Sequence, residues 1–289
     1  MSYTVRAMTS ENPDPRLDRD APPAPRDAAG WLAALGEAAA FFTRLPVGGA
    51  GAPSYRLADT LPVVPVVGVA IGLAAGIDLA IARGLGASSL LAAAVGVLTA
   101  VVITGALHED GLADTIDAFG APGAVRTRRL EILRDSRIGV FGALALMFSL
   151  LFRVAALAQI VDTRGALAAL LALAAAHALS RAALGWTLWS SPPARADGLS
   201  AGIGAVSQAT AGWTLGVGGA IAFVCLVWVT PLVALLAPPL AVAIAAGTAS
   251  VARERVGGHT GDTLGATQQF VEIAILILVA LAVGLGARV

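Results

Sequence analysis

Long apolar stretches alternate with short polar segments along most of this chain. Each stretch is about 20 residues long, which is the length a helix needs to cross ~30 Å of hydrocarbon. We therefore predict an all-α fold, a polytopic transmembrane helical bundle of about seven spans. The pattern leaves open whether 213–250 is one bent hairpin or two spans with a turn at Pro231. The spans are expected near residues 61–83, 88–107, 139–160, 166–190, 213–231, 232–250 and 270–287.

The N-terminal part of the chain follows a different pattern. Residues 1–30 are polar and rich in proline, with no apolar core of a signal peptide, and we predict a disordered tail there. Residues 31–42 then predict an amphipathic helix at the membrane interface. The chain is thus expected to consist of a tail, 1–30, and a membrane-embedded domain, 31–289. The apolar face of the interfacial helix comprises Trp31, Leu32, Leu35, Ala38, Ala39 and Phe42.

Composition agrees with a membrane protein and narrows its partners. Of the 289 residues, 57% are hydrophobic and only 13% are charged, about half the charged fraction of a soluble domain. The formal net charge is zero, so nothing points to nucleic acid as a partner. Membrane lipid is the expected surrounding, and a homo-oligomer is left open.

Arginine sets the predicted orientation. By the positive-inside rule, the segments richest in arginine face the cytoplasm. These are the N-terminal region and the loops 108–138, 191–212 and 251–269, whereas the other side holds only Arg83, Arg164 and Arg288. We expect an integral protein of the bacterial inner membrane, with its polar loops and its active site on the cytoplasmic side.

The densest chemistry follows the second predicted span. The segment His108–Asp117 places Asp110, Asp114 and Asp117 at i, i+4 and i+7, which is one face of a helix. Clustered carboxylates repel one another unless a cation neutralises them, and Mg²⁺ is held by one or two carboxylates together with substrate phosphates. The aspartates therefore indicate a metal site for phosphoryl transfer. The alternative is a solvated acidic helix end at the membrane surface.

The other polar loops add candidates for binding phosphate. Arg137 follows Asp135 at an expected helix start, where a guanidinium can bind phosphate with two hydrogen bonds. The glycine-rich turn around Gly258 and Thr260 exposes backbone amides that can bind an anion, although it lacks the lysine of a P-loop. Asp262 in that turn is either a further metal ligand or a helix N-cap.

Four strings together resemble cobalamin synthase, the adenosylcobinamide-GDP ribazoletransferase family. They occur in that family's order, and the resemblance spans residues 33–287. It implies a Mg²⁺-dependent membrane phosphotransferase of cobalamin biosynthesis. Such an enzyme joins adenosylcobinamide-GDP to α-ribazole, or to its 5′-phosphate, and releases GMP. The strings are Phe42–Pro46, Leu107–Asp117, Arg134–Gly139 and Gly257–Ala266.

The resemblance implies roles for individual residues. A ribazole hydroxyl attacks the phosphate on cobinamide, with Asp114, Asp117 and Arg137 as catalytic residues and Asp117 as a candidate base. Substrate binding falls to His108, Arg134, Arg181, Gly258 and Thr260, at a cytoplasmic cavity wide enough for a corrinoid and lined by the aspartates. The Mg²⁺ ligands would be Asp110, Asp114, Asp117, Asp135 and Asp262.

Two alternatives remain open from sequence alone. The D-G-x-x-x-D spacing is shared with CDP-alcohol phosphotransferases, but Asp114 and Thr115 stand where that family has Ala and Arg. An ion or drug transporter can also carry an acidic cluster. A transporter is expected to hold its charges near mid-membrane between repeated halves, whereas here the charges gather in loops on one side.

Overall fold

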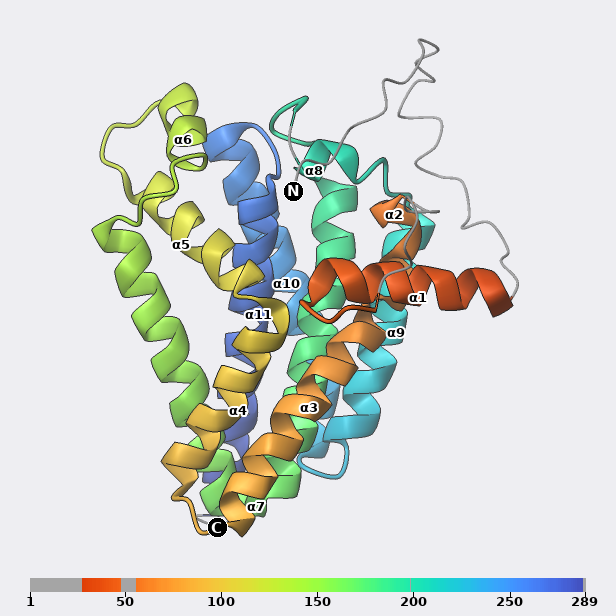
Figure 1. The fold of residues 1–289 in the computed structure, drawn as a ribbon, viewed down its shortest axis with the longest axis vertical. Coiled ribbons are helices and arrows are strands. Elements are labelled where there is room, and N and C mark those ends of the chain that lie inside the picture. Colours follow the sequence, from red (N-terminus) through yellow and green to blue (C-terminus); the bar gives the residue numbers. More distant parts are fainter. Residues whose placement is uncertain (1–27, 48–55, 198, 288–289) are drawn as a thin grey trace.

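The computed structural model describes residues 28–47, 56–197 and 199–287, and within these ranges the chain is helical (Figure 1). Residues 1–27, where most of the predicted disordered tail falls, lie outside the described residues. The helices are α1 (Ala28–Phe42), α2 (Leu57–Thr60), the 3₁₀ helix η1 (Leu61–Val63), α3 (Val64–Gly84), α4 (Ser89–Thr104), α5 (Leu107–Gly120), α6 (Arg126–Ile132), α7 (Val140–Ser190), α8 (Leu199–Gly202), α9 (Gln208–Leu226), α10 (Pro231–Val256) and α11 (Gly261–Gly286).

The all-α prediction is confirmed, but the number of spans is not. Five helical segments are long and apolar enough to cross a membrane, namely 57–84, α7, α9, α10 and α11, and the bent pair α4 and α5 would make a sixth. Segment 213–250 is two helices, since α10 begins at Pro231. The 51-residue α7 covers both predicted spans 139–160 and 166–190 and reverses at Gly165, whose φ is 82°. Its two halves therefore run antiparallel (Figure 1).

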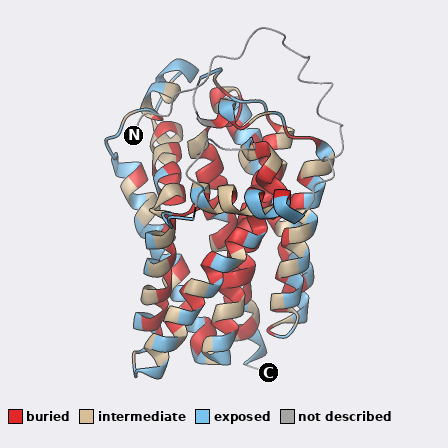
Figure 2. Cartoon of the chain, turned by 45° about the vertical axis from the view of Figure 1, so that its right-hand side comes forward, coloured by how far each residue is buried: buried red, intermediate tan, exposed pale blue. Residues whose placement is uncertain are grey.

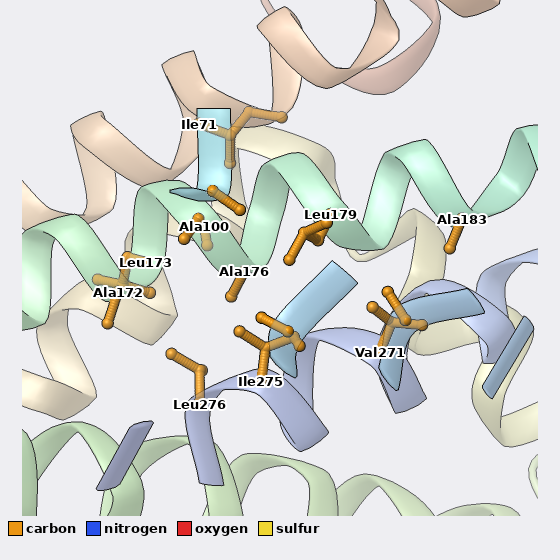
Figure 3. Close-up of a cluster of buried hydrophobic side chains, with 14 of the residues drawn as sticks. Ile71, Ala100, Ala172, Leu173, Ala176, Leu179, Ala183, Val271, Ile275 and Leu276 are labelled. Carbon is orange, nitrogen blue, oxygen red and sulfur yellow. The ribbon is translucent and has the colours of Figure 1, made fainter. Parts of the chain in front are cut away.

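The second half of α7 forms the centre of the bundle. Its alanines from Ala169 to Ala183 are fully buried, and this half packs against α3, α4 and α11 around Ile71, Leu179 and Ile275 (Figure 3). Gly72 and Gly76 of α3 face it, and a Cβ at either position would lie 2.6–2.7 Å from the α7 backbone around residues 170–174. Small residues at such a crossing let two backbones approach closely, which drives helix association in lipid.

The outer faces of the long helices carry large apolar side chains. Leu98 of α4, Met147 of α7 and Leu235 of α10 are all more than 60% exposed, as a lipid-facing surface requires. Figure 2 shows exposed and intermediate positions along the outer helices. Helix α1 lies across the bundle (Figure 1). It buries Ala38 and Phe42 of its predicted apolar face against the bundle and leaves Leu32 70% exposed.

A sharp bend between α4 and α5 changes the direction of the chain at the start of the acidic segment. Gly105 and Ala106 both adopt left-handed backbone angles, with φ of 62° and 58°, and α5 leaves α4 at 90°. Ala106 is the only residue other than glycine with positive φ in the described ranges. Because of this bend, α5 runs in a different direction from α4, and the aspartates lie on a separate helix.

Candidate active site

The three polar loops meet at one end of the bundle, where Figure 1 shows α6 and α8. Segments 192–194 and 257–259 pair through a parallel bridge: Ala194 N–H donates to the His259 carbonyl at 2.8 Å, and His259 N–H donates to the Pro192 carbonyl at 2.8 Å. Arg126 joins the third loop to them, because its guanidinium donates to the carbonyls of Val256 (2.8 Å) and Ala194 (3.0 Å). The loops therefore frame a single region.

Helix α5 crosses the start of α11 closely enough to bring distant aspartates together. A Cβ at Gly111 would lie 2.8 Å from the Asp262 carbonyl oxygen and 3.1 Å from the Gly265 Cα. Only glycine at this crossing allows that approach. Asp114 consequently lies within electrostatic range of Asp110 and Asp262, and also of Asp117 and Asp135. All five predicted metal ligands are thus close enough to interact electrostatically, and three of them lie on α5.

A cavity of ≈ 260 Å³ adjoins this crossing. Two predicted metal ligands, Asp110 and Asp262, line it together with His108 and Arg195. Its remaining walls are mostly apolar. Of the aspartates expected to line a corrinoid-sized cavity, Asp110 lines this one, whereas Asp114, Asp117 and Asp135 are not among its lining residues. The apolar lining residues are Phe41, Phe42, Leu57, Leu61, Leu107, Leu184, Leu188, Ile203 and Leu264.

Asp117 points away from the cavity toward the start of α7. Its two carboxylate oxygens accept hydrogen bonds from the backbone amides of Gly139 (2.7 Å) and Gly142 (2.8 Å). A carboxylate at a helix N-terminus satisfies free amides and the helix dipole, a contribution of about 0.5–2 kcal/mol. Asp117 therefore connects α5 to α7 through these hydrogen bonds. In its predicted role as base or metal ligand, Asp117 would have to use the same two carboxylate oxygens.

Asp135 and Arg137 form an exposed ion pair in the loop before α7. The Arg137 guanidinium donates to both carboxylate oxygens, at 2.9 Å through Nε and 2.6 Å through Nη2. These hydrogen bonds lower the pKa of Asp135 to about 2. The Arg137 side chain is 85% exposed, so the predicted phosphate ligand is free to exchange one partner for another.

A buried ion network lies on the opposite face of α5. Arg153 of α7 donates to Glu109 at 2.9 Å and to Glu272 of α11 at 3.2 Å, and each side chain is at most 8% exposed. His177 Nδ1 lies 3.2 Å from Glu272 and 2.9 Å from the Arg181 guanidinium. Two arginines and two glutamates balance in charge, as burial requires.

The predicted substrate-binding residues occupy varied positions. Arg181 is fully buried in this network, beside the cavity-lining His108, which stacks on Phe42 with ring centroids 5.9 Å apart. Arg134 pairs with Asp197 at 2.6 Å on the surface. Gly258 and Thr260 serve the fold, since Gly258 lies against the Pro192 carbonyl and Thr260 caps α11. Their contact with substrate stays a prediction.

Arg195 is a cavity residue that sequence reasoning missed. From sequence it is only one of the arginines that set the orientation, within loop 191–212, yet it lines the cavity and its positive charge acts on Asp262. Its Nη1 atom is buried without a hydrogen-bond partner. Little in the sequence marks Arg195 as a site residue, because it is more than 60 residues from Asp262 and no motif of the resemblance contains it.

The donor set fits Mg²⁺ only in part. Across the ranges that the structure describes, no group of three or more His, Cys, Asp or Glu side chains is arranged to hold a metal ion. Mg²⁺ does not need such a cage, because it keeps several waters and takes one or two carboxylates plus substrate phosphates. Asp110 and Asp262 at one cavity, with Asp114 beside them, meet that requirement.

Comparison with known proteins decides the family. The profile of a family described as cobalamin-5-phosphate synthase matches residues 34–280. The chain belongs to this family. A curated adenosylcobinamide-GDP ribazoletransferase of Azorhizobium caulinodans is 47% identical over 85% of this chain and 94% of its own length. Proteins of the same name from Mesorhizobium japonicum (42% identical, 84% and 90% covered) and Rhizobium etli (44%, 85% and 95%) are also similar. No solved structure matches.

Membership settles the alternatives that the sequence left open. This cobalamin-5-phosphate synthase family member is a transferase of cobalamin biosynthesis, neither a lipid phosphotransferase nor a transporter. The match covers α1 from Ala34 onward and all of α3 to α10, so the aspartates of α5, the bridged loops and the start of α11 all lie within it.

Proposed function

We propose that the chain joins adenosylcobinamide-GDP to α-ribazole, or to its 5′-phosphate, and releases GMP. The observation that carries this proposal is the meeting of Asp110, Asp262 and Arg195 at one cavity below the bridged loops. Carboxylates beside a cation are what transfer of a phosphoryl group between two oxygens requires. The names of the relatives supply the substrates.

The reaction exchanges one phosphate ester partner for another. A ribose hydroxyl of α-ribazole forms a new O–P bond to the phosphate that cobinamide carries. The bond between that phosphorus and the bridging oxygen of the diphosphate breaks, and GMP leaves with the bridging oxygen. The hydroxyl proton passes to a carboxylate. We assign this role to Asp114, because its partial burial, and then the negative charges of Asp110 and Asp262, favour protonation there.

Asp110 and Asp262 would hold Mg²⁺ at the diphosphate. When bound, the ion neutralises charge on the phosphate oxygens and orients them. Arg195 adds a fixed positive charge at the same cavity. Arg137, exposed and close to the cluster through Asp135, is proposed to bind the departing phosphate. Asp117 and Asp135 are further candidate ligands, and there Mg²⁺ would compete with the amide donors of α7 or with Arg137.

We place this site on the cytoplasmic side of the inner membrane. The end of the bundle with the bridged loops carries Arg126, Arg128, Arg129, Arg134, Arg137, Arg195, Arg253 and Arg255, whereas the described part of the other end carries Arg83 and Arg164. Such an asymmetry is the positive-inside pattern.

The test is a reaction with the purified protein in detergent or vesicles. Adenosylcobinamide-GDP and α-ribazole are supplied with Mg²⁺, and GMP and the joined corrinoid are quantified. We expect equal amounts of both products, loss of activity with EDTA, and recovery when Mg²⁺ is added back. Absence of GMP release by protein that remains folded would refute the proposed substrates, and full activity in EDTA would refute the metal.

A further inference from the structure

The lining of the cavity at the α5–α11 crossing is of two chemical kinds. Asp110, Asp262 and Arg195 supply charge. Most of the remaining lining is formed by leucine, isoleucine and phenylalanine side chains from α1, α2, η1, α5, α7 and α11. A ligand that fits this lining carries a charged or hydroxylated part and a largely apolar part.

The apolar part of the lining includes flat aromatic surfaces. The rings of Phe42 and His108 are nearly parallel, at 10° with centroids 5.9 Å apart, and Phe41 meets Phe42 edge-on at 4.9 Å. Leu184 and Leu188, at 4% and 8% exposure, lie one helical turn apart on the same cavity wall. A planar aromatic group is well matched to such walls, because it stacks on rings and packs edge-on against leucine.

Size and polarity select among the groups that the two substrates carry. At ≈ 260 Å³ the cavity is below even the usual ~300–1,000 Å³ range of drug-sized pockets, so it cannot enclose a corrin macrocycle. Guanine would fit by size, but its carbonyl, ring N–H and amino groups need hydrogen-bond partners that leucine and phenylalanine cannot provide. The dimethylbenzimidazole of α-ribazole is planar, carries two methyl groups and has one ring nitrogen free to accept.

We infer that this cavity is the base pocket for α-ribazole and that its leucine wall selects the base. This inference rests on the proposed function. The dimethylbenzimidazole lies among Phe42, Leu184 and Leu188, and the ribose extends toward Asp110, Asp262 and Arg195, where its hydroxyl meets the phosphate. The corrinoid stays outside the cavity, at the surface framed by the bridged loops.

Enlarging the pocket tests the inference through a change of specificity. Leu188→Ala removes bulk from the wall, so a riboside of naphthimidazole, one ring larger than the natural base, should gain at least tenfold in kcat/KM relative to α-ribazole. Wild-type protein should in turn lose at least tenfold in kcat/KM with the riboside of unsubstituted benzimidazole, since each lost methyl group is worth roughly 10-fold or more in a close-fitting pocket. The KM for adenosylcobinamide-GDP should not change in either comparison.

A matched control and the opposing outcomes complete the experiment. Leu167→Ala alters the same residue type on the same half of α7, at a side chain 69% exposed, and should leave the ratio between the two ribosides unchanged. An unchanged ratio in Leu188→Ala, or a change confined to the KM for adenosylcobinamide-GDP, would overturn the base pocket. Wild-type protein that releases no GMP with α-ribazole would instead refute the proposed function.

Discussion

Glu109 and Asp110 are neighbours in the chain but face opposite environments. Glu109 is 6% exposed and binds Arg153 inside the bundle, whereas Asp110 is exposed at the cavity. The buried glutamate fixes the rotation of α5, and that rotation aims Asp110 at Asp262. A single helical turn thus holds one carboxylate in the ion network and one at the cavity.

Removing the charge at the cavity should abolish activity without unfolding the protein. Asp110→Asn and Asp262→Asn keep the side-chain shape, so each should lower the rate of GMP release at least 100-fold, about 2.7 kcal/mol of transition-state stabilisation. Asp78→Asn is the control, because Asp78 accepts a hydrogen bond from Thr99 on helices away from the cavity. Wild-type rates in both cavity variants would contradict the assignment.

The Asp135–Arg137 pair makes a prediction about pH. Because the pKa of Asp135 is lowered from 3.8 to about 2, the stability that this pair provides is present above pH 3.8 and is lost as the pH falls through 2. Arg137→Ala should raise that pKa toward 3.8, which carboxyl NMR of labelled aspartate can follow. An unchanged titration of Asp135 in the variant would show that Arg137 is not the cause.

At the scale of elements, the sequence predicted what depends on local composition. Apolar length identified the segments of α3, α9, α10 and α11, and the spacing of Asp110 and Asp114 predicted one helical face. The bend at Gly105 and Ala106 was not predicted, because alanine carries no signal for left-handed backbone angles. The partners of Arg153 were also hidden, since Glu109 and Glu272 lie 44 and 119 positions away along the chain.

The bend itself can be tested at Ala106. A left-handed alanine costs about 1–2 kcal/mol relative to a right-handed one, and glycine avoids that cost. Ala106→Gly should therefore raise the thermal unfolding temperature, with a gain of about 1 kcal/mol after the added chain entropy is subtracted. Ala93→Gly, in the right-handed middle of α4, should lower it. A lower unfolding temperature in Ala106→Gly would argue against the strained bend.

At the scale of the whole molecule, the two ends of the bundle predict different accessibility. On a Cys225→Ser background, cysteines at Val125, Asp197 and Glu254 should react with an impermeant thiol reagent from the cytoplasmic side only. Cysteines at Leu85 and Arg164 should react from the opposite side only. A loop cysteine that reacts only from outside would contradict the proposed orientation and the common site of the three loops.

The ion network connects α5, α7 and α11, so its loss should destabilise the whole fold. Arg153→Met leaves Glu109 and Glu272 buried beside each other without their shared cation, which should cost about 3–5 kcal/mol of unfolding free energy. Adding Glu109→Gln should recover part of that loss, as measured by denaturant unfolding in detergent. Strictly additive losses in the double variant would show that the residues do not interact.

The same network constrains how the protein is made. Arg153 and Arg181 lie on the two halves of α7, and they leave the ribosome long before Glu272 of α11, the last helix that the structure describes. Until α11 arrives, the nascent membrane chain holds two arginines and only one of their two glutamates. Insertion of α7 into the membrane therefore precedes the neutralisation of its charges. A chain truncated before α11 keeps an uncompensated cation, and we expect the membrane proteases of the cell to degrade it.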